Sequence, residues 1–403
     1  MKRILFSILL VILIAACAAP ETQIETALDA TESQPAATPT VEEATSATQS
    51  VTAPQGTPLP EEIAAPEVNS PSIIFIEMMD EVYGWGVTEE NIIRTNDGGA
   101  TWYNVTPPGL TEVGYSVFPE FLDVTHAWIQ VVDPNNYPNG GTLYRTSDGG
   151  LNWETFATPF SAGDMEFLDA NNGWILADLG VGAGSMAVSV FQTQNGGETW
   201  NRVYTNDPNL GDAGETLPLS GLKILLVPLD MKTAWVGGVT YSPGTVYLFR
   251  TDDAGKTWFN ISLILPDEAQ TSELGVEMVK FLSPKQGILA LRMTSAKPQT
   301  ILYATNDGGN TWELLPEVIP GIGRFAVPSA REIIVYAENR FHVTEDAGKT
   351  FNTVVPEITF GNSITDMSFV NSKTGWVITA SPTGRRTLYK TTDGCQTWFP
   401  LIP

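Results

Sequence analysis

The stretch TNDGGATW at Thr95–Trp102 recurs in seven related copies, and these copies decide the fold of the chain. The other six are TSDGGLNW (Thr146–Trp153), TQNGGETW (Thr193–Trp200), TDDAGKTW (Thr251–Trp258), TNDGGNTW (Thr305–Trp312), TEDAGKTF (Thr344–Phe351) and TTDGCQTW (Thr391–Trp398). Successive copies begin 51, 47, 58, 54, 39 and 47 residues apart. Repeats of this length are typical of proteins assembled from one recurring structural unit, so the sequence predicts a repeat architecture.

Each copy lies among short β-prone segments. An apolar run ending in an aromatic precedes it, as in Ile73–Trp85, and a short strand such as Leu143–Thr146 leads directly into it. No segment of 72–403 has helical periodicity, and four antiparallel strands in about 40–50 residues are typical of a propeller blade. We therefore predict an all-β, seven-bladed β-propeller with four-stranded antiparallel blades of contiguous chain. The repeated turn would come before the outer strand of each blade.

The repeated residues fit a tight turn between strands. The third position should accept hydrogen bonds from backbone amides two residues on, the fifth should supply a positive φ, and the final aromatic should pack on its own blade. The third positions are Asp97, Asp148, Asn195, Asp253, Asp307, Asp346 and Asp393. The fifth-position glycines are Gly99, Gly150, Gly197, Gly255, Gly309 and Gly348, and the aromatics are Trp102, Trp153, Trp200, Trp258, Trp312, Phe351 and Trp398. We interpret these residues as structural.

The seventh copy has Cys395 where the others have glycine. A side chain there should strain the turn, because only glycine adopts positive φ at low cost. The sequence therefore predicts that Cys395→Gly raises the melting temperature.

The N-terminus is typical of an export signal. Lys2 and Arg3 precede the apolar run Ile4–Ile14, which is too short to span about 30 Å of hydrocarbon. The run ends in Ile-Ala-Ala-Cys, which resembles a bacterial lipobox, so we expect a signal peptide at 1–16 and lipidation of Cys17; the alternative is an ordinary secretory signal. Residues 17–71 hold nine acidic residues and no Lys, Arg or aromatic, which predicts a disordered tether after the lipid anchor.

Charge excludes several partners for the predicted propeller. Residues 72–403 contain 19 basic and 37 acidic residues, a net charge of −18. This argues against nucleic acid, whose phosphates are bound by Lys and Arg, and against anionic lipid head groups. We expect membrane contact through the lipid anchor only, a monomer, and a location outside the cytoplasm: the cell surface, the periplasm or a thylakoid lumen.

The pattern Ser/Thr-x-Asp-x-Gly-x-x-Trp/Phe resembles the Asp-box, or BNR repeat, of sialidases, sortilin-type receptors and xyloglucan-degrading enzymes. With Gly-Trp pairs in preceding strands, the chain is most similar to the photosystem II stability and assembly factor family. That resemblance implies a seven-bladed, lipid-anchored scaffold that assists a membrane protein complex. It also implies docking on arginines, for which Arg385 and Arg386 are the adjacent pair. Cations at one repeat position before the box (Arg94, Arg145, Arg250 and Lys390) are interpreted as structural.

The residues predict binding without catalysis. The Arg-Ile-Pro motif of sialidases does not occur, and the resembling xyloglucan enzymes use two propellers. We therefore expect no catalytic residues, no cofactor and no metal, and interpret the calcium-like loops at Asp133 and Asp207 as polar turns. Two alternatives stay open: a cell-surface propeller that binds glycan or an envelope protein, and a glycoside hydrolase. A partner site is expected at the channel mouth or in the insertions 133–141, 205–220 and 266–275, since loops on rigid scaffolds carry function.

Overall fold

The computed structural model describes residues 63–402, which form an all-β unit. The predicted signal peptide, Cys17 and most of the predicted tether lie outside the described residues. Besides strands, the described chain has two short 3₁₀ helices, η1 (Gly114–Ser116) and η2 (Asp267–Thr271). The prediction of an all-β chain with four-stranded antiparallel sheets is confirmed.

Five sheets each consist of four consecutive antiparallel strands. The first three contain β1 (Ile73–Met78), β2 (Gly84–Thr88), β3 (Ile92–Thr95) and β4 (Tyr103–Asn104); β5 (Val117–Phe121), β6 (Ala127–Val132), β7 (Gly141–Thr146) and β8 (Glu154–Thr158); and β9 (Gly163–Phe167), β10 (Gly173–Gly182), β11 (Ser185–Thr193) and β12 (Asn201–Thr205). The last two contain β22 (Arg324–Ala326), β23 (Ile333–Ala337), β24 (Arg340–Thr344) and β25 (Asn352–Val354); and β26 (Ile364–Phe369), β27 (Gly375–Ala380), β28 (Arg386–Thr391) and β29 (Phe399–Ile402).

The middle of the chain forms one nine-stranded sheet. Its strands are β13 (Leu222–Pro228), β14 (Ala234–Val239), β15 (Tyr247–Thr251), β16 (Phe259–Asn260), β17 (Glu273–Phe281), β18 (Gly287–Thr294), β19 (Gln299–Thr305), β20 (Glu313–Leu314) and β21 (Ile319–Pro320). A single residue pair, Val239 with Gly275, joins the β13–β16 part to the rest. This sheet therefore consists of two sets of strands that are paired at a single position and share an apolar core.

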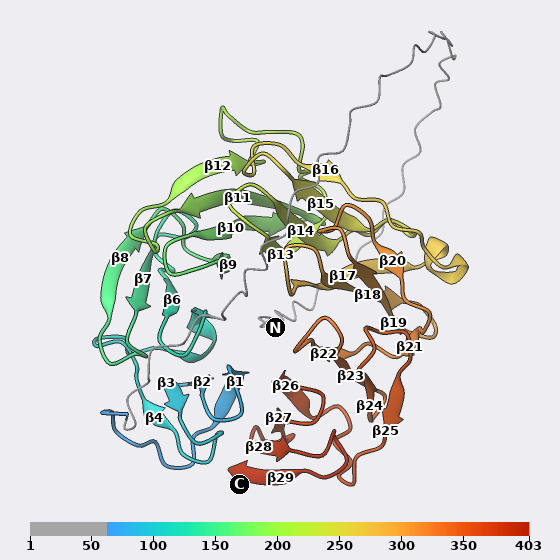
Figure 1. Ribbon diagram of the computed structural model, residues 1–403. Helices are drawn as coiled ribbons and strands as arrows, with labels where there is room; N and C mark the ends of the chain where they lie inside the picture. The colour runs from blue at the N-terminus through green and yellow to red at the C-terminus, as the bar shows by residue number, and fades with distance from the viewer. Residues whose placement is uncertain (1–62, 403) are drawn as a thin grey trace, which may run out of the picture. The chain divides into compact units, whose positions relative to one another are not determined.

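The sheets follow one another around a central axis, with the first strand of each innermost (Figure 1). Apolar side chains fill the spaces between neighbouring sheets. The first and last sheets also share a core, in which Trp102 and Ile76 pack with Trp376. The Trp376 indole N–H donates to the carbonyl of Gly98 at 2.8 Å. The circle thus closes by packing, and no strand is exchanged between these two sheets.

Every box is held by one buried threonine hydroxyl. The Thr95 hydroxyl accepts the N–H of Gly99 at 2.9 Å and donates to Asp97 Oδ1 at 2.9 Å. The same Asp97 oxygen accepts the N–H of Thr101 at 2.9 Å. These three contacts recur in all seven copies.

The sequence-based prediction for the acceptor was therefore wrong in one detail. The carboxylate accepts from the amide four residues on, not two, in every box. The reason is that two consecutive residues, such as Gly98 and Gly99 with φ of 76° and 92°, both adopt left-handed conformations. They turn the chain back, so the amide of Thr101 faces Asp97.

Residues 63–71, expected to lie in the tether, run beside the outermost strand of the first sheet. Glu67 forms a bridge with Tyr103, and the Val68 N–H donates to the Trp102 carbonyl at 2.8 Å. Ile63 is buried. This segment covers the edge of β4, and the folded unit thus begins before Ser72.

Cys395 has the left-handed conformation that the turn demands, with φ of 71°. Its side chain is also fully buried, in a cluster with Phe341 and Trp398. A left-handed conformation costs a residue with a Cβ about 1–2 kcal/mol. Removing a buried side chain has a cost of similar size, which opposes the rise in melting temperature predicted from the sequence.

We predict that Cys395→Gly is more stable than Cys395→Ala. Both variants lose the buried thiol, but only glycine also relieves the left-handed strain. Thermal unfolding of the two variants and the wild type measures the order. A Cys395→Ala protein that melts at or above Cys395→Gly would contradict it.

The box carboxylates should also make stability depend on pH. Hydrogen bonds from Thr311 lower the pKa of Asp307 to about 2, and those from Thr350 do the same for Asp346. An aspartate in an unfolded chain has a pKa of about 3.9. The stabilisation by Asp307 and Asp346 is thus complete above about pH 4 and is lost as the pH falls toward 2.

We therefore expect the melting temperature to fall between pH 5 and pH 2, and to fall less in Asp307→Asn. Asparagine already serves in the third box, where Asn195 accepts the Thr199 N–H at 3.0 Å. Asp267→Asn, an exposed aspartate in η2, is the matched control. An identical pH dependence for Asp307→Asn and wild type would refute this role.

Candidate functional site

The acidic side chains of the inner strands are tied to the neighbouring sheet. Asp366 accepts the N–H of Ile76 at 2.9 Å, and Asp164 accepts that of Leu226 at 2.6 Å. Glu120 accepts the N–H of Phe167 at 3.2 Å. An inner strand has a free edge whose amides would otherwise lack partners. Much of the acidity around the axis is therefore structural.

One lysine also faces this axis. Burial lowers the pKa of Lys280, and the negative charges of Glu77 and Glu166 oppose that shift. Its ammonium group therefore lies among acidic side chains that partly balance it. The channel is a charged passage, and the residues near Lys280 already interact with one another.

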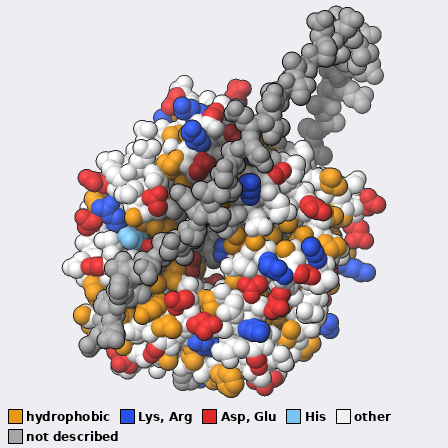
Figure 2. Space-filling model, in the orientation of Figure 1, with side chains coloured by type: hydrophobic (Ala, Val, Ile, Leu, Met, Phe, Trp, Pro, Cys, Tyr) orange, Lys and Arg blue, Asp and Glu red, His pale blue; other side chains and the backbone are white. Residues whose placement is uncertain are grey.

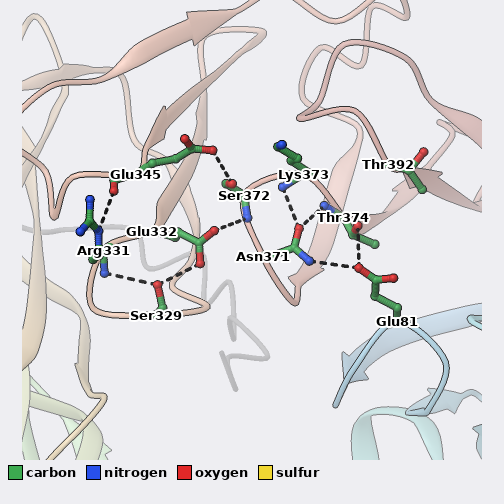
Figure 3. Close-up of a pocket in the computed structure, with 10 residues that line it drawn as sticks. All are labelled: Glu81, Ser329, Arg331, Glu332, Glu345, Asn371, Ser372, Lys373, Thr374 and Thr392. Carbon is green, nitrogen blue, oxygen red and sulfur yellow. Dashed lines mark hydrogen bonds between the residues drawn. The ribbon is translucent and has the colours of Figure 1, made fainter.

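A polar recess of about 540 Å³ opens beside the loops of the last two sheets and the first (Figure 3). It is lined by Glu81, Ser329, Arg331, Glu332, Glu345, Asn371, Ser372, Lys373, Thr374 and Thr392. Glu332 accepts the N–H of Ser372 at 2.9 Å, and Glu345 accepts the Ser372 hydroxyl at 2.6 Å. Glu81 accepts from Asn371 and Thr374, both at 3.2 Å.

These contacts hold the loop 371–374 in place. Burial alone would raise the pKa of Glu332. The hydrogen bonds from Ser372 and Ser329 have a larger combined effect, so the pKa of Glu332 is lowered. Glu332 is thus an ionised acceptor and unsuited to be a general acid, which needs a raised pKa. The recess has no aromatic ring among its lining residues. Its main role is to join neighbouring sheets.

The opposite end of the unit differs. In a four-stranded antiparallel sheet, the loops after the second and fourth strands lie at the end away from the box turn. Three strongly exposed tyrosines occur in such loops: Tyr115 (55% exposed), Tyr137 (43%) and Tyr241 (59%). Single exposed aromatics are common on protein surfaces, but exposed aromatics that gather on one surface are typical of contact sites.

Two of these tyrosines lie around the tip of the long β10–β11 hairpin. The Tyr137 hydroxyl bonds to the Asp178 carboxylate, which also accepts the N–H of Gly180 at 2.8 Å. The Tyr241 ring lies against Gly184, where a Cβ would come within 3.1 Å of it. We call Tyr137, Asp178, Val181, Leu219 and Tyr241 the tyrosine platform; Val181 and Leu219 are 51% and 37% exposed.

Two of the three predicted insertions contribute residues to this platform, and the third touches a loop that does. The loop 133–141 contributes Tyr137, and the loop 205–220 reaches the hairpin where the Met186 N–H donates to the Leu219 carbonyl at 3.0 Å. The segment 266–275 touches the β14–β15 loop where the Gly244 N–H donates to the Ser272 carbonyl at 2.9 Å. Segments far apart in sequence thus form one surface.

A buried lysine fixes the loop 205–220 beneath the platform. The Lys223 ammonium, on a side chain that is 2% exposed, donates to the carbonyls of Leu219 (2.8 Å), Met186 (2.9 Å), Gly221 (3.1 Å) and Ser220 (3.3 Å). Burial lowers its pKa to about 8, so the group remains charged at neutral pH. Sequence reasoning missed Lys223, although a lysine in the apolar run Leu222–Val227 was a visible signal.

The other predicted residues lie elsewhere. Arg385 is exposed, and Arg386 donates to the Tyr115 hydroxyl at 2.9 Å, between the last and first sheets. On the face drawn in Figure 2, basic side chains are scattered among acidic ones without a continuous basic patch.

The cations at the repeat position reach the next box. Arg94 donates to the Gly149 carbonyl at 3.3 Å and Arg145 to the Asn195 carbonyl at 2.8 Å.

The calcium-like loops use their oxygens internally. Asp207 Oδ1 accepts from Asn209 N at 3.0 Å and Nδ2 at 2.8 Å, and Asp212 pairs with Arg202 at 2.7 Å. Within 63–402, no group of three His, Cys, Asp or Glu side chains is arranged to hold a metal ion. The same residues include no helix long and apolar enough to cross a membrane.

The fold and the repeated turn define a β-propeller of Asp-box type. No family model matches the chain. A curated xyloglucanase from Paenibacillus sp is 24% identical over 340 residues, which is 76% of this chain and 29% of that protein. The chain therefore spans less than a third of the curated relative it matches.

Solved structures show the same fold at low identity. A xyloglucanase of glycoside hydrolase family 74 from Xanthomonas campestris has a TM-score of 0.54 and 10% identity, covering 84% of this chain and 55% of that one. YCF48 bound to a D1 peptide has a TM-score of 0.49 and 13% identity, covering 83% and 99%. The Xanthomonas campestris match supports the propeller fold and leaves the activity open.

The sequence comparison corrects the prediction that the protein is not an enzyme. That prediction rested on missing sialidase motifs and on the presence of one propeller. A match at 24% identity to a xyloglucanase over 340 residues contradicts it. The comparison points to glycan-active proteins.

We predict that Lys223→Met loosens the loop 205–220. The change removes the donor shared by four carbonyls while keeping a long apolar side chain, and buried acceptors without donors are costly. Amide hydrogen exchange should become faster in 205–221. Lys285→Met, an exposed lysine between β17 and β18, is the control. Unchanged protection of 205–221 would contradict the proposed fastening.

Proposed function

We propose that this protein is an exported propeller that binds an extracellular polysaccharide of the β-glucan type. The observation that carries the proposal is the match to a xyloglucanase over 76% of the chain. The exposed tyrosines at the loop end add support, because an amphipathic ring can cover a sugar face and leave its hydroxyl wet.

The proposed architecture has seven blades. The nine-stranded sheet would count as two of them, since strands of its two halves pair only at Val239–Gly275. Each half carries one box, at Thr251–Trp258 and Thr305–Trp312. One box per blade then accounts for all seven copies.

The proposed location is outside the cytoplasm. The basic start, the apolar run Ile4–Ile14 and Cys17 support a lipoprotein signal at 1–16, and the composition of the following segment supports a tether. A propeller held in this way would meet soluble polymers at the cell surface. Palmitate labelling that is lost in Cys17→Ser tests the anchor.

A second candidate is binding of a membrane protein complex, as the resemblance to photosystem II assembly factors implies. The supporting observation is the exposed Arg385 beside the contact between Arg386 and Tyr115. An aromatic and two arginines are common at protein interfaces. This contact lies apart from the tyrosine platform.

Affinity electrophoresis tests the first proposal. The folded unit should migrate more slowly in gels that contain xyloglucan or mixed-linkage β-glucan than in gels without polymer. Release of reducing ends from the same polymers measures hydrolysis. Unchanged migration with every β-glucan, together with stoichiometric co-purification of membrane proteins, would overturn it in favour of the second candidate.

A further inference from the structure

We propose that the tyrosine platform is the polysaccharide-contacting surface and that it selects uncharged chains over polyanionic ones. The inference rests on the proposed function and adds the site and the chemical class of the ligand. Three features of the platform support it: the exposed rings, the carboxylates around them and the hydrogen bonds of Lys223 below.

The rings offer apolar area on both sides of the hairpin tip. Tyr137 comes from the β6–β7 loop, and Tyr241 comes from the β14–β15 loop. Val181 and Leu219 add exposed apolar area. The C–H faces of pyranose rings are apolar, so a row of such side chains matches several sugar units in turn.

Polar groups beside the rings match sugar hydroxyls. Asp178 accepts from Tyr137 and from Gly180, and burial raises its pKa. The β6–β7 loop adds exposed asparagines at 135, 136 and 139. Hydroxyl groups both donate and accept, so a neutral sugar can pair with acids and amides without bringing a charge.

The charge near the platform is negative. The acidic residues on its loops are Asp133, Asp178, Asp207, Asp212 and Glu215. The two nearby cations are already engaged: Arg202 pairs with Asp212, and Lys223 is buried among carbonyls. A polyanion would bring like charges together without a free cation to offset them, at low ionic strength most strongly. A neutral chain meets no such barrier.

The hydrogen bonds of the Lys223 ammonium group pre-organise this surface. Four carbonyls from the hairpin and the loop 205–220 share one ammonium, so the platform is ordered before a ligand arrives. Because the loops need not become ordered when a ligand binds, less of the favourable contact free energy is lost to entropy and the affinity is higher. A basic peptide would also suit an acidic surface with tyrosines, and the test below separates it from a sugar chain.

The experiment compares two polymers with one backbone: hydroxyethylcellulose, which is neutral, and carboxymethylcellulose, which is anionic. Affinity electrophoresis and titration calorimetry measure wild type, Tyr137→Ala, Tyr241→Ala and the double variant. Phe399→Ala is the matched control, an exposed aromatic residue on the outermost strand of the last sheet. Thermal unfolding checks that each variant is folded.

We expect binding to the neutral polymer, and weaker binding to the anionic polymer at about 0.01 M salt. This difference should shrink at about 1 M salt, where the screening length is about 3 Å. Each platform variant should lose about tenfold in affinity and Phe399→Ala should not, since a few central aromatics carry most binding energy.

Two outcomes would overturn the inference. Binding that survives in the double variant would place the sugar elsewhere and leave the proposed function standing. Equal or tighter binding of the anionic polymer at low salt would refute the selection by charge. Failure of the wild type to bind any β-glucan, with retention of an oligolysine peptide that the double variant loses, would refute the proposed function itself.

Discussion

One buried threonine hydroxyl organises each box, and the propeller depends on it. It accepts the amide of the fifth box residue and donates to the carboxylate that holds the seventh, so one side chain fixes two left-handed residues in sequence. All seven threonines are buried. The turn then delivers the aromatic at a fixed position, and that ring fills the space next to the neighbouring sheet. Local hydrogen bonding thus sets the packing of the whole unit.

Neighbouring sheets are also joined at the fourth residue of the box, where the turn leaves little room for a side chain. Arg94 contacts the box of the next sheet at its fourth residue, Gly149, and Arg145 contacts the following box at Gly196. A Cβ at either glycine would collide with the arginine. In two other boxes, Ala254 and Ala347 stand in place of this glycine. The sheets before these two boxes have Gln192 and Ala304, which are uncharged, at the position of the cation. The repeat cation and the glycine of the next box therefore act as a pair at Gly98, Gly149 and Gly196, whereas a Cβ at Gly308 or Gly394 would meet a backbone carbonyl instead.

The repeats made the fold predictable, but not the site. Spacing and turn residues indicated β-sheets and their order, because each box repeats the same local chemistry. The acceptor amide was misassigned, since two successive positive φ angles cannot be read from one Asp-x-Gly pattern. The platform was indicated only as three irregular loops. The contact of Tyr137 with Asp178 joins residues 41 positions apart, which no periodicity encodes. The absence of catalysis was inferred from motifs of another enzyme class, and the xyloglucanase match corrects it.

The two ends of the unit have different constraints. At the box end, side chains such as Glu81, Arg94 and Trp376 bond to a neighbouring sheet, so changes there disturb packing. At the other end, loops are free to lengthen, because the strands below are already fixed. Lys223 shows how such a loop gains order: one buried ammonium replaces the regular strand contacts that the insertion lacks. A surface built in this way can change its side chains for a ligand while the boxes hold the sheets. The division explains why the most repetitive residues say little about function and the least repetitive ones say most.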